Sequence, residues 1–499
     1  MEFESNYDIS RVADFIHSNN FTRVALQFPD EMLKDSSRVA SAIRHKLCLL
    51  EDAKPSEEPR AAIKLYVMAD TTYGSCCVDE VGAAHVNAQC VIHYGHSCLS
   101  PTTTIPALCI FGKASIGASS CAESLCNYAS KRSKPVLVLF GLEYAHALPA
   151  IGVALTTESM RSHGPKSGFE IHYADVFSSV INPEAAKTTK GQLKVNDNQY
   201  ESECLTGKTH REYRIGGLVW SLPEDHRMED YLLFWIGADD AAFSNVVITF
   251  NSSEIVRYDA TESCLMTDVS QQRKILKRRY YLVEKAKDAN MVGILIGTLG
   301  VAGYLHMIHQ MKELVTRAGK KAYTFVMGRP NPAKLANFPE CDVFIYVSCA
   351  QTALLDSKDF LAPIITPFEA MLAYNRGSRW TGAYVMEFQD LIASSPVEVK
   401  EQSEARFSFL EGGYVEESEL QGDDKDKEGV LSLVNITQKA LQLRNKDTQL
   451  ISSKSAKSGA EFFAARTFQG LDLHYENATP EPFLIGRSGK ASAYEDEQN

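Results

Sequence analysis

The sequence of 499 residues contains no stretch of about 18 consecutive apolar residues, the length that a membrane-spanning helix needs. Its first residues, Met1-Glu2-Phe3-Glu4, are acidic and lack the basic and apolar regions of a signal peptide. Basic residues are not in surplus, because 51 Lys and Arg stand against 63 Asp and Glu. The net charge of −12 argues against a broad electrostatic grip on nucleic acid, and we interpret the basic stretch at residues 273–279 as a solvated helix face. We expect a cytoplasmic protein that binds neither membranes nor nucleic acid.

The twelve cysteines are not expected to form disulfides, because the cytosol keeps thiols reduced. Free cysteine behaves as a small buried hydrophobe, and this is our interpretation of every cysteine without a further feature. These residues are Cys48, Cys109, Cys204, Cys264 and Cys341, together with Cys121 and Cys126, which share one predicted helix.

One pattern of strands and helices occurs twice along the chain. The first copy predicts strands at residues 24–28, 65–68 and 90–94, with helices at 31–49 and 78–87. The second copy predicts strands at residues 292–296, 322–327 and 342–347, with helices at 304–318 and 331–338. Strands that alternate with helices indicate parallel-sheet α/β units, and the near-continuous apolar strands are typical of sheets buried on both faces.

The middle of the chain predicts a variant of the same unit, with strands at residues 136–140, 215–220 and 231–236 and a polar insertion at 183–211. We therefore expect an α/β fold of three related domains, 1–134, 135–270 and 271–393, each a small, mostly parallel sheet flanked by helices. Residues 394–499 are expected to form a partly disordered C-terminal tail, because their polar composition cannot bury enough apolar surface to offset the entropy of ordering. Two ordered islands are expected there, at residues 430–443 and 462–471.

Four cysteines lie where the predicted strands end. Cys76 and Cys77 follow the second strand of the first unit, and Cys98 follows its third strand. Cys349 follows the third strand of the last unit, so it holds the same place in the repeat as Cys98, and each is preceded by a serine. Ligands in open parallel sheets bind outside the carboxyl ends of the strands, which makes these cysteines candidate functional residues.

Several chemistries are compatible with these cysteines. Three thiolates can hold an iron–sulfur cluster and leave one iron open, although the spacing differs from a ferredoxin run and from a compact CxxxCxxC loop. Zinc is an alternative, since His93 and His96 lie beside Cys98. Nucleophilic catalysis lacks a matched base in the sequence. The residues alone leave these chemistries open, together with a set of scattered buried thiols.

Several motifs of this chain are similar to those of the diphthamide-synthesis proteins over residues 10–390. The main matches are Tyr73-Gly74-Ser75-Cys76-Cys77-Val78-Asp79-Glu80 and His93-Tyr94-Gly95-His96-Ser97-Cys98-Leu99. Further matches are Ala25-Leu26-Gln27-Phe28-Pro29-Asp30, Gly297-Thr298-Leu299-Gly300 and Asn331-Pro332-Ala333-Lys334-Leu335-Ala336-Asn337-Phe338. The stretch Phe344-Ile345-Tyr346-Val347-Ser348-Cys349, the Tyr-Gly-Ser form and the long tail resemble the second of the two eukaryotic subunits in this family.

This resemblance implies three similar domains and, in the catalytic members, one cysteine from each domain on a 4Fe-4S cluster. That cluster cleaves S-adenosylmethionine, and the 3-amino-3-carboxypropyl group is transferred to a histidine of translation elongation factor two. The implied partners are a homologous catalytic subunit, which binds the S-adenosylmethionine, and a small CSL-type zinc/iron electron donor with its reductase.

The chain departs from the catalytic pattern in its middle domain, where we match the cysteine-bearing strand end to Gly217-Leu218-Val219-Trp220-Ser221-Leu222-Pro223, a stretch without cysteine. We therefore expect a non-catalytic subunit that holds a 4Fe-4S cluster through Cys77, Cys98 and Cys349 and aids reduction of the partner's cluster. Cys76 competes with Cys77 for this role, since adjacent residues point in different directions and both are not expected to reach one cluster. The alternative is a purely structural subunit without a cluster.

Overall fold

The computed structural model describes residues 2–415 with gaps at 54–61, 72, 133, 164–169, 184–194, 197–198, 204–208, 224, 269, 356–358, 376–377, 379, 381, 383, 394–405 and 409–412. Contacts divide the chain into a compact unit, Met1–Asp423, and a second unit, Asp424–Asn499, which lies wholly outside the described residues. The ordered islands expected at 430–443 and 462–471 also lie outside them, as does Cys204.

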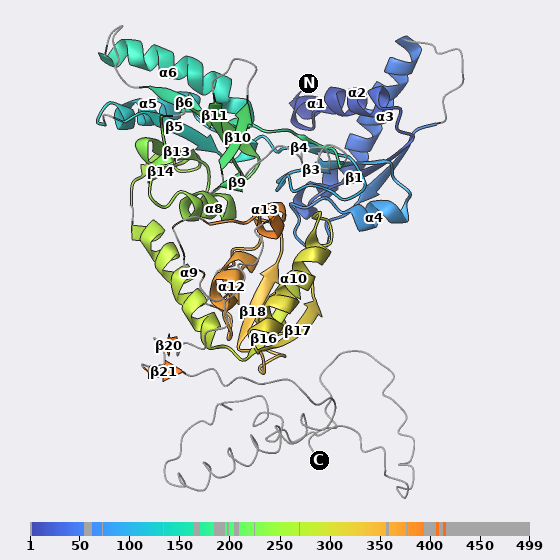
Figure 1. Ribbon diagram of the computed structural model, residues 1–499. Helices are drawn as coiled ribbons and strands as arrows, with labels where there is room; N and C mark the ends of the chain where they lie inside the picture. The colour runs from blue at the N-terminus through green and yellow to red at the C-terminus, as the bar shows by residue number, and fades with distance from the viewer. Residues whose placement is uncertain are drawn as a thin grey trace, which may run out of the picture. The chain divides into compact units, whose positions relative to one another are not determined.

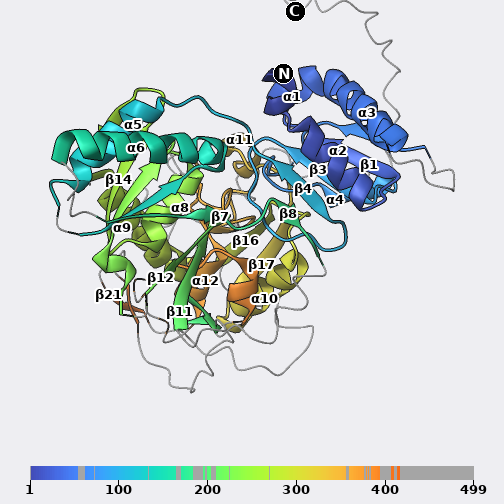
Figure 2. The ribbon, with the colours of Figure 1, turned by 90° about the horizontal axis from the view of Figure 1, so that it is seen from above.

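The first sheet has the order β2-β1-β3-β4, with all four strands parallel (Figure 1). Side chains alternate between its two faces, so that Val24 and Leu26 of β1 pack with α2 and α3, whereas Ala25 packs on the opposite face near α4. Figures 1 and 2 both show α2 and α3 side by side. The elements of this part are α1 (Glu2–Asn6), α2 (Ile9–Ser18), β1 (Arg23–Gln27), the 3-10 helix η1 (Asp30–Asp35), α3 (Ser36–Ala53), β2 (Lys64–Met68), α4 (Glu80–His85), β3 (Cys90–Tyr94) and β4 (Ala107–Ile110).

A second sheet, near the end of the described chain, repeats this order as β17-β16-β18-β19, again with parallel strands. One face of β16 packs with α9 and α10, and the other face packs near α11. The elements are α9 (Ser270–Asp288), β16 (Met291–Ile296), α10 (Tyr304–Arg317), β17 (Lys321–Val326), α11 (Pro332–Leu335), β18 (Val343–Val347), β19 (Ile364–Ile365), α12 (Pro367–Tyr374) and α13 (Phe388–Ala393).

The middle sheet contains the same order once more, as β6-β5-β13-β14, and β15 adds an antiparallel edge strand. Its helices α5 and α6 lie side by side in both views (Figures 1 and 2). The elements are α5 (Ala118–Ala129), β5 (Val136–Phe140), the 3-10 helix η2 (Leu142–Ala147), α6 (Leu148–His163), β6 (Ile171–Tyr173), the 3-10 helix η5 (Met228–Asp230), β13 (Leu232–Ile236), α8 (Ala241–Thr249), β14 (Glu254–Asp259) and β15 (Cys264–Met266). The strand order is therefore common to all three parallel sheets.

A separate antiparallel sheet interrupts the middle unit between β6 and β13, with the order β7-β12-β11-β10-β9. The bounds of these strands are β7 (Asp175–Val176), β9 (Val195–Asn196), β10 (Gln199–Glu203), β11 (Thr209–Ile215) and β12 (Leu218–Leu222). Between β7 and β9, the short strand β8 (Val180–Ile181) joins the edge of the first sheet beside β4. This segment thus ties the middle unit to the first sheet.

The single strand predicted at residues 215–220 is wrong, because the chain turns there. Gly216 and Gly217 adopt φ values of 57° and 86° and form a two-residue turn, across which Ile215 pairs with Leu218. Two consecutive residues with positive φ are what a type I′ hairpin requires, and glycine meets that requirement without strain. β12 therefore belongs to the antiparallel sheet, and the third strand of the middle parallel sheet is β13.

The predicted α/β class is confirmed, whereas the domain boundaries near 134, 270 and 393 stay predictions. Within the tail assigned from 394, β20 (Arg406–Ser408) and β21 (Gly413–Val415) form an antiparallel pair that the composition did not reveal. In the described parts of the chain, every helix is too short or too polar to span a lipid bilayer.

A buried ion pair joins α9 to α12. Arg279 donates to Glu369 from Nε at 2.6 Å and also from Nη2, and the two side chains are 6% and 0% exposed. Glu369 also accepts from the backbone N–H of Thr366 at the start of α12. The interpretation of residues 273–279 as a solvated helix face is therefore wrong for Arg279.

We expect Arg279→Met to lower the free energy of unfolding by about 3–5 kcal/mol, because it leaves the Glu369 carboxylate buried without its partner. Urea unfolding followed by circular dichroism measures this change. The matched control is Arg317→Met, which breaks an exposed pair with Glu313 and should cost less than about 1 kcal/mol. Equal effects of the two substitutions would contradict the importance of the buried pair.

Candidate metal centre

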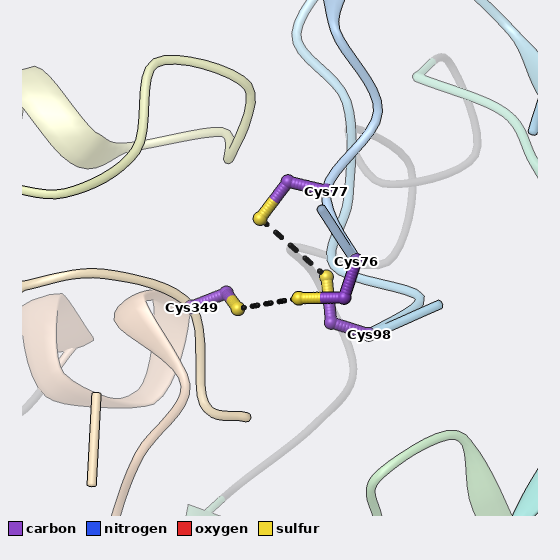
Figure 3. A group of neighbouring side chains, drawn as sticks. All are labelled: Cys76, Cys77, Cys98 and Cys349. Atoms are coloured by element: carbon purple, nitrogen blue, oxygen red, sulfur yellow. Dashed lines mark hydrogen bonds between the residues drawn. The ribbon is translucent and has the colours of Figure 1, made fainter. Parts of the chain in front are cut away.

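The four cysteines at the strand ends come together in the structure. Cys76 and Cys77 follow β2, Cys98 follows β3, and Cys349 follows β18 of the last sheet. Their Sγ atoms all lie within 4.8 Å of one another, with 3.4 Å between Cys76 and Cys349 and 3.8 Å between Cys77 and Cys98 (Figure 3). Each residue is at most 6% exposed. The group therefore includes all three predicted site residues and also Cys76.

The expectation that Cys76 and Cys77 cannot both reach one site is wrong. Side chains alternate in direction along an extended strand, but these two residues lie in a turn in which the N–H of Cys77 donates to the carbonyl of Gly74 at 3.0 Å. The N–H of Cys98 in turn donates to the carbonyl of Cys76 at 3.0 Å. Figure 3 shows both sulfur atoms on the side of the loop that faces Cys349.

Polar side chains of the first sheet hold this turn in place. Gln27, at the end of β1, donates to the carbonyl of Cys77 at 3.0 Å and accepts from the N–H of Asp79 at 2.9 Å. His93, in β3, donates from Nε2 to the carbonyl of Ser75 at 3.1 Å, and burial lowers the pKa of His93 to about 4. A neutral His93 that supports the backbone explains its position without a role as a zinc ligand.

The loop after β16 closes the site from the last sheet. Thr298 donates its hydroxyl toward the Sγ of Cys77 at 3.7 Å. A Cβ atom at Gly300 would lie 2.1 Å from the carbonyl oxygen of Val78, so only glycine permits this approach of the two backbones. The Gly297-Thr298-Leu299-Gly300 motif is therefore explained by contact with the loop that carries Cys76 and Cys77.

An ion pair and a hydroxyl group complete the contacts around the thiols. Arg329, after β17, donates to the Asp70 carboxylate at 2.7 Å and to the carbonyl of Tyr73 at 2.6 Å. Thr352 places its hydroxyl 3.2 Å from the Sγ of Cys349. The Arg329 contacts thus join the segment after β17 of the last sheet to the segment after β2 of the first sheet.

The thiols do not ionise equally. The pKa of Cys349 lies well below the usual thiol value, first because of its hydrogen bond with Cys76 and then because of the neighbouring thiols of Cys77 and Cys98. The pKa values of Cys76 and Cys77 lie well above it, first because of their hydrogen bonds to Cys349 and then because of other thiols and burial. Cys349 therefore becomes a thiolate, the form that binds metal, more readily than Cys76 and Cys77 do.

Four converging, buried thiols are a donor set for soft metals, either an iron–sulfur cluster or a single zinc ion. Zinc–sulfur bonds of about 2.3 Å place the sulfurs of a tetrahedral site about 3.8 Å apart, close to the spacing found here. An iron–sulfur cluster is wider than one ion, so the sulfur atoms would lie farther apart around it. Their positions on turns and strand ends, rather than within helices or strands, permit that adjustment.

The middle sheet differs from the other two in the residues that follow its third parallel strand. The topological equivalent of the strand ends at Cys98 and Cys349 is the end of β13, which continues as Gly237-Ala238-Asp239-Asp240. We had matched the cysteine-bearing strand end of the catalytic members to residues 217–223. That match is wrong, because Gly217 lies in the hairpin turn and the residues after it form β12 of the antiparallel sheet. Trp220 is instead buried in the middle core and stacks on Tyr213 with 5.9 Å between ring centroids.

A cavity of about 480 Å³ borders Cys98 on the side of the middle unit. Its lining includes Arg214 next to the hairpin turn, the buried Asn245 of α8, and Glu387 and Asp390 near the start of α13. Burial is the main cause that raises the pKa of Glu387 to about 7, and the negative charges of Asp390 and Cys349 contribute less to this shift. The sequence analysis missed these residues, since they carry no spacing or strand-end signal.

Comparisons with known proteins bear on these residues. The family model described as putative diphthamide synthesis protein matches residues 28–385. The chain is 35% identical to 2-(3-amino-3-carboxypropyl)histidine synthase subunit 2 of Danio rerio, over 99% of this chain and 92% of the relative. It is 32% identical to the protein of the same name from Schizosaccharomyces pombe, over 98% of this chain and 90% of that relative. The resemblance to the family and to its second eukaryotic subunit is thereby confirmed.

Among solved structures, a crystal structure of Dph2 from Pyrococcus horikoshii with a 4Fe-4S cluster covers 76% of this chain and 93% of its own. The TM-score is 0.49 and the identity is 17%, a likeness too low to support conclusions about individual residues.

We expect Glu387→Gln to stabilise the protein at pH 8 by roughly 1–3 kcal/mol and to have little effect at pH 5. The folded pKa of about 7 lies above the usual value of 4.5, so the native state favours the protonated carboxyl. Its cost to stability is absent below the unfolded pKa, grows as the pH rises from 4.5 to about 7, and stays constant above that.

Urea unfolding at the two pH values measures this difference. Glu262→Gln, at an exposed position, is the control and should show no such pH dependence. A wild-type stability that rises relative to Glu387→Gln between pH 5 and pH 8 would contradict the assignment.

Proposed function

Because the chain belongs to the diphthamide synthesis protein family, we propose that it is the iron–sulfur subunit 2 of a 2-(3-amino-3-carboxypropyl)histidine synthase. In this proposal the complex transfers the 3-amino-3-carboxypropyl group from S-adenosylmethionine to a histidine of translation elongation factor two. The chain itself is not the catalytic subunit and aids reduction of its partner's cluster. The relatives that carry the name of subunit 2 match nearly the whole chain, which supports this assignment.

One observation carries the proposal, namely the buried group of thiols to which the first and last sheets both contribute. Cys77, Cys98 and Cys349 would hold a 4Fe-4S cluster, and such a group supplies reversible one-electron transfer. Thr298 would donate a hydrogen bond to the thiolate of Cys77, and Thr352 to that of Cys349. Hydrogen bonds to the sulfurs and burial are the means by which a protein tunes the reduction potential of a cluster.

The non-catalytic role rests on the middle unit. In the catalytic members each domain is expected to supply one cysteine, whereas the end of β13 in this chain carries Gly237 and Asp240. S-adenosylmethionine would therefore be bound by a homologous catalytic subunit, with electrons delivered by a small CSL-type zinc/iron protein and its reductase. The common strand order of the three sheets supports the proposed domains 1–134, 135–270 and 271–393.

A second candidate is a structural zinc ion on the same cysteines, in a subunit without a cluster. The sulfur distances of 3.4 and 3.8 Å favour this alternative, since they match the edge of a tetrahedral zinc–thiolate site. Metal analysis separates the two candidates, because only a cluster contains iron and acid-labile sulfide.

We expect the chain purified without oxygen, and reconstituted with iron and sulfide, to contain four iron and four sulfide per molecule. The double variant Cys98→Ser/Cys349→Ser should lose nearly all of this iron, because two thiolates cannot retain the cluster. The matched control is Cys48→Ser/Cys264→Ser, which changes an exposed and a partly exposed cysteine away from the site. Zinc without iron in the wild-type protein, or equal iron in the two variants, would contradict the cluster.

We also expect the isolated chain, loaded and fully reduced, not to cleave S-adenosylmethionine. Mass spectrometry of the reaction products measures this, and the same assay with the catalytic subunit added is the positive control. Release of aminocarboxypropyl products by this chain alone would overturn the non-catalytic role.

A further inference from the structure

We propose that Leu99 is a positioning residue for the metal centre, through which the hairpin turn of the middle unit holds Cys98 in place. The four thiols of the site follow strands of the first and last sheets. The middle unit acts on them through the contact between Leu99 and Gly217. The effect on a bound cluster rests on the proposed function, whereas the effect on the position of Cys98 does not.

The backbone of Leu99 has a conformation that leucine rarely adopts. Its φ of 53° lies in the left-handed region, where the Cβ atom crowds the main chain. Such a conformation persists only where the surrounding structure imposes it, and it is concentrated beside functional groups. Leu99 directly follows Cys98, so the contacts that impose its conformation also fix the path of the chain as it leaves Cys98.

Hydrogen bonds within the first unit hold the backbone of this turn. The N–H of Leu99 donates to the hydroxyl of Ser97 at 3.2 Å. That hydroxyl donates toward the Sγ of Cys109, in β4, at 3.3 Å, and both Ser97 and Cys109 are buried. These bonds fix the main chain on both sides of Cys98, and the side chain of Leu99 is held by other contacts.

The side chain of Leu99 reaches the middle unit. It packs both in the core on the α4 face of the first sheet and in the core of the middle unit. A Cβ atom at Gly217, in the hairpin turn, would lie 2.5 Å from Cδ1 of Leu99, so the leucine fits only because residue 217 has no side chain. The Sγ of Cys98 lies 3.8 Å from that of Cys77. Adjacent side chains thus contact the middle unit and the thiols.

The position of Cys98 therefore depends on the middle unit as well as on its own sheet. Without the hairpin turn against Leu99, the left-handed conformation loses a contact that imposes it, and the chain after Cys98 relaxes. The same turn lines the cavity that borders Cys98, so a looser turn admits water to the sulfur. Solvent exposure helps to set the reduction potential of an iron–sulfur cluster. The middle unit thus tunes the cluster without supplying a ligand.

The first test measures how fast iodoacetamide alkylates Cys98 in the metal-free full-length chain, with mass spectrometry to locate the modification. Gly217→Ala places a methyl group against Leu99. We expect it to raise the rate at Cys98 roughly tenfold, the change in an opening equilibrium that follows from release of the strain stored in a left-handed leucine.

The matched control is Gly216→Ala in the same hairpin turn. Its φ of 57° strains the turn in the same way, but its Cβ atom would lie 3.9 Å from Nε2 of Gln351, with no contact to Leu99. This variant should leave Cys98 as protected as in the wild type. Equal alkylation rates at Cys98 in the two glycine variants would overturn the proposal.

Two fully buried cysteines serve as internal references, Cys90 in β3 and Cys121 in α5. A rise at Cys98 in Gly217→Ala that both references share would mean general loosening and would also overturn the proposal. Leu99→Ala should expose Cys98 as well. In the double variant the two effects should not add, because both substitutions break one contact.

The second test measures the midpoint potential of the reconstituted cluster by redox titration with electron paramagnetic resonance. We expect Gly217→Ala and Leu99→Ala to shift the potential to a more positive value, because water stabilises the more negatively charged reduced state. Gly216→Ala should leave the potential unchanged. Leu99→Met keeps a long apolar side chain and should also retain the wild-type potential.

The two tests separate this inference from the proposed function. Faster alkylation of Cys98 with an unchanged potential overturns the tuning of the cluster and leaves the positioning of Cys98 in place. A wild-type chain that holds no iron overturns the proposed function, and the alkylation rates of the metal-free chain then decide whether Leu99 positions Cys98.

Discussion

The junction between the first and last parallel sheets depends on one constraint, the burial of four thiols at the carboxyl ends of their strands. Hydrogen bonding to Cys349 is the largest cause of the raised pKa values of Cys76 and Cys77, and burial and the repulsion between ionised thiols so close together add to it. A bound metal centre removes this repulsion by coordinating the thiolates. Metal binding and the joining of the two sheets are therefore expected to be energetically coupled, since Gly300 and Thr298 contact the loop of Cys77 directly.

The three sheets share one strand order but differ in the residues that follow the third parallel strand. The end of β3 leads to Cys98 and the end of β18 leads to Cys349, whereas the end of β13 leads to Gly237 and Asp240. The middle unit instead carries an antiparallel sheet inserted before β13, and its hairpin turn lines the cavity beside Cys98. The middle unit thus contributes part of the wall of a cavity that borders Cys98.

Much of the site could be predicted, because strand ends in a repeated unit are visible in the sequence. The apolar strands before Cys98 and Cys349 were placed within a residue of their observed bounds, and parallel topology then brings their ends to one edge. The convergence of Cys76 with the other three thiols could not be predicted in this way, since the alternation of side chains applies to strands and the residue lies in a turn. The ion pair of Arg279 was missed because its partner, Glu369, lies 90 positions away and only tertiary packing brings them together.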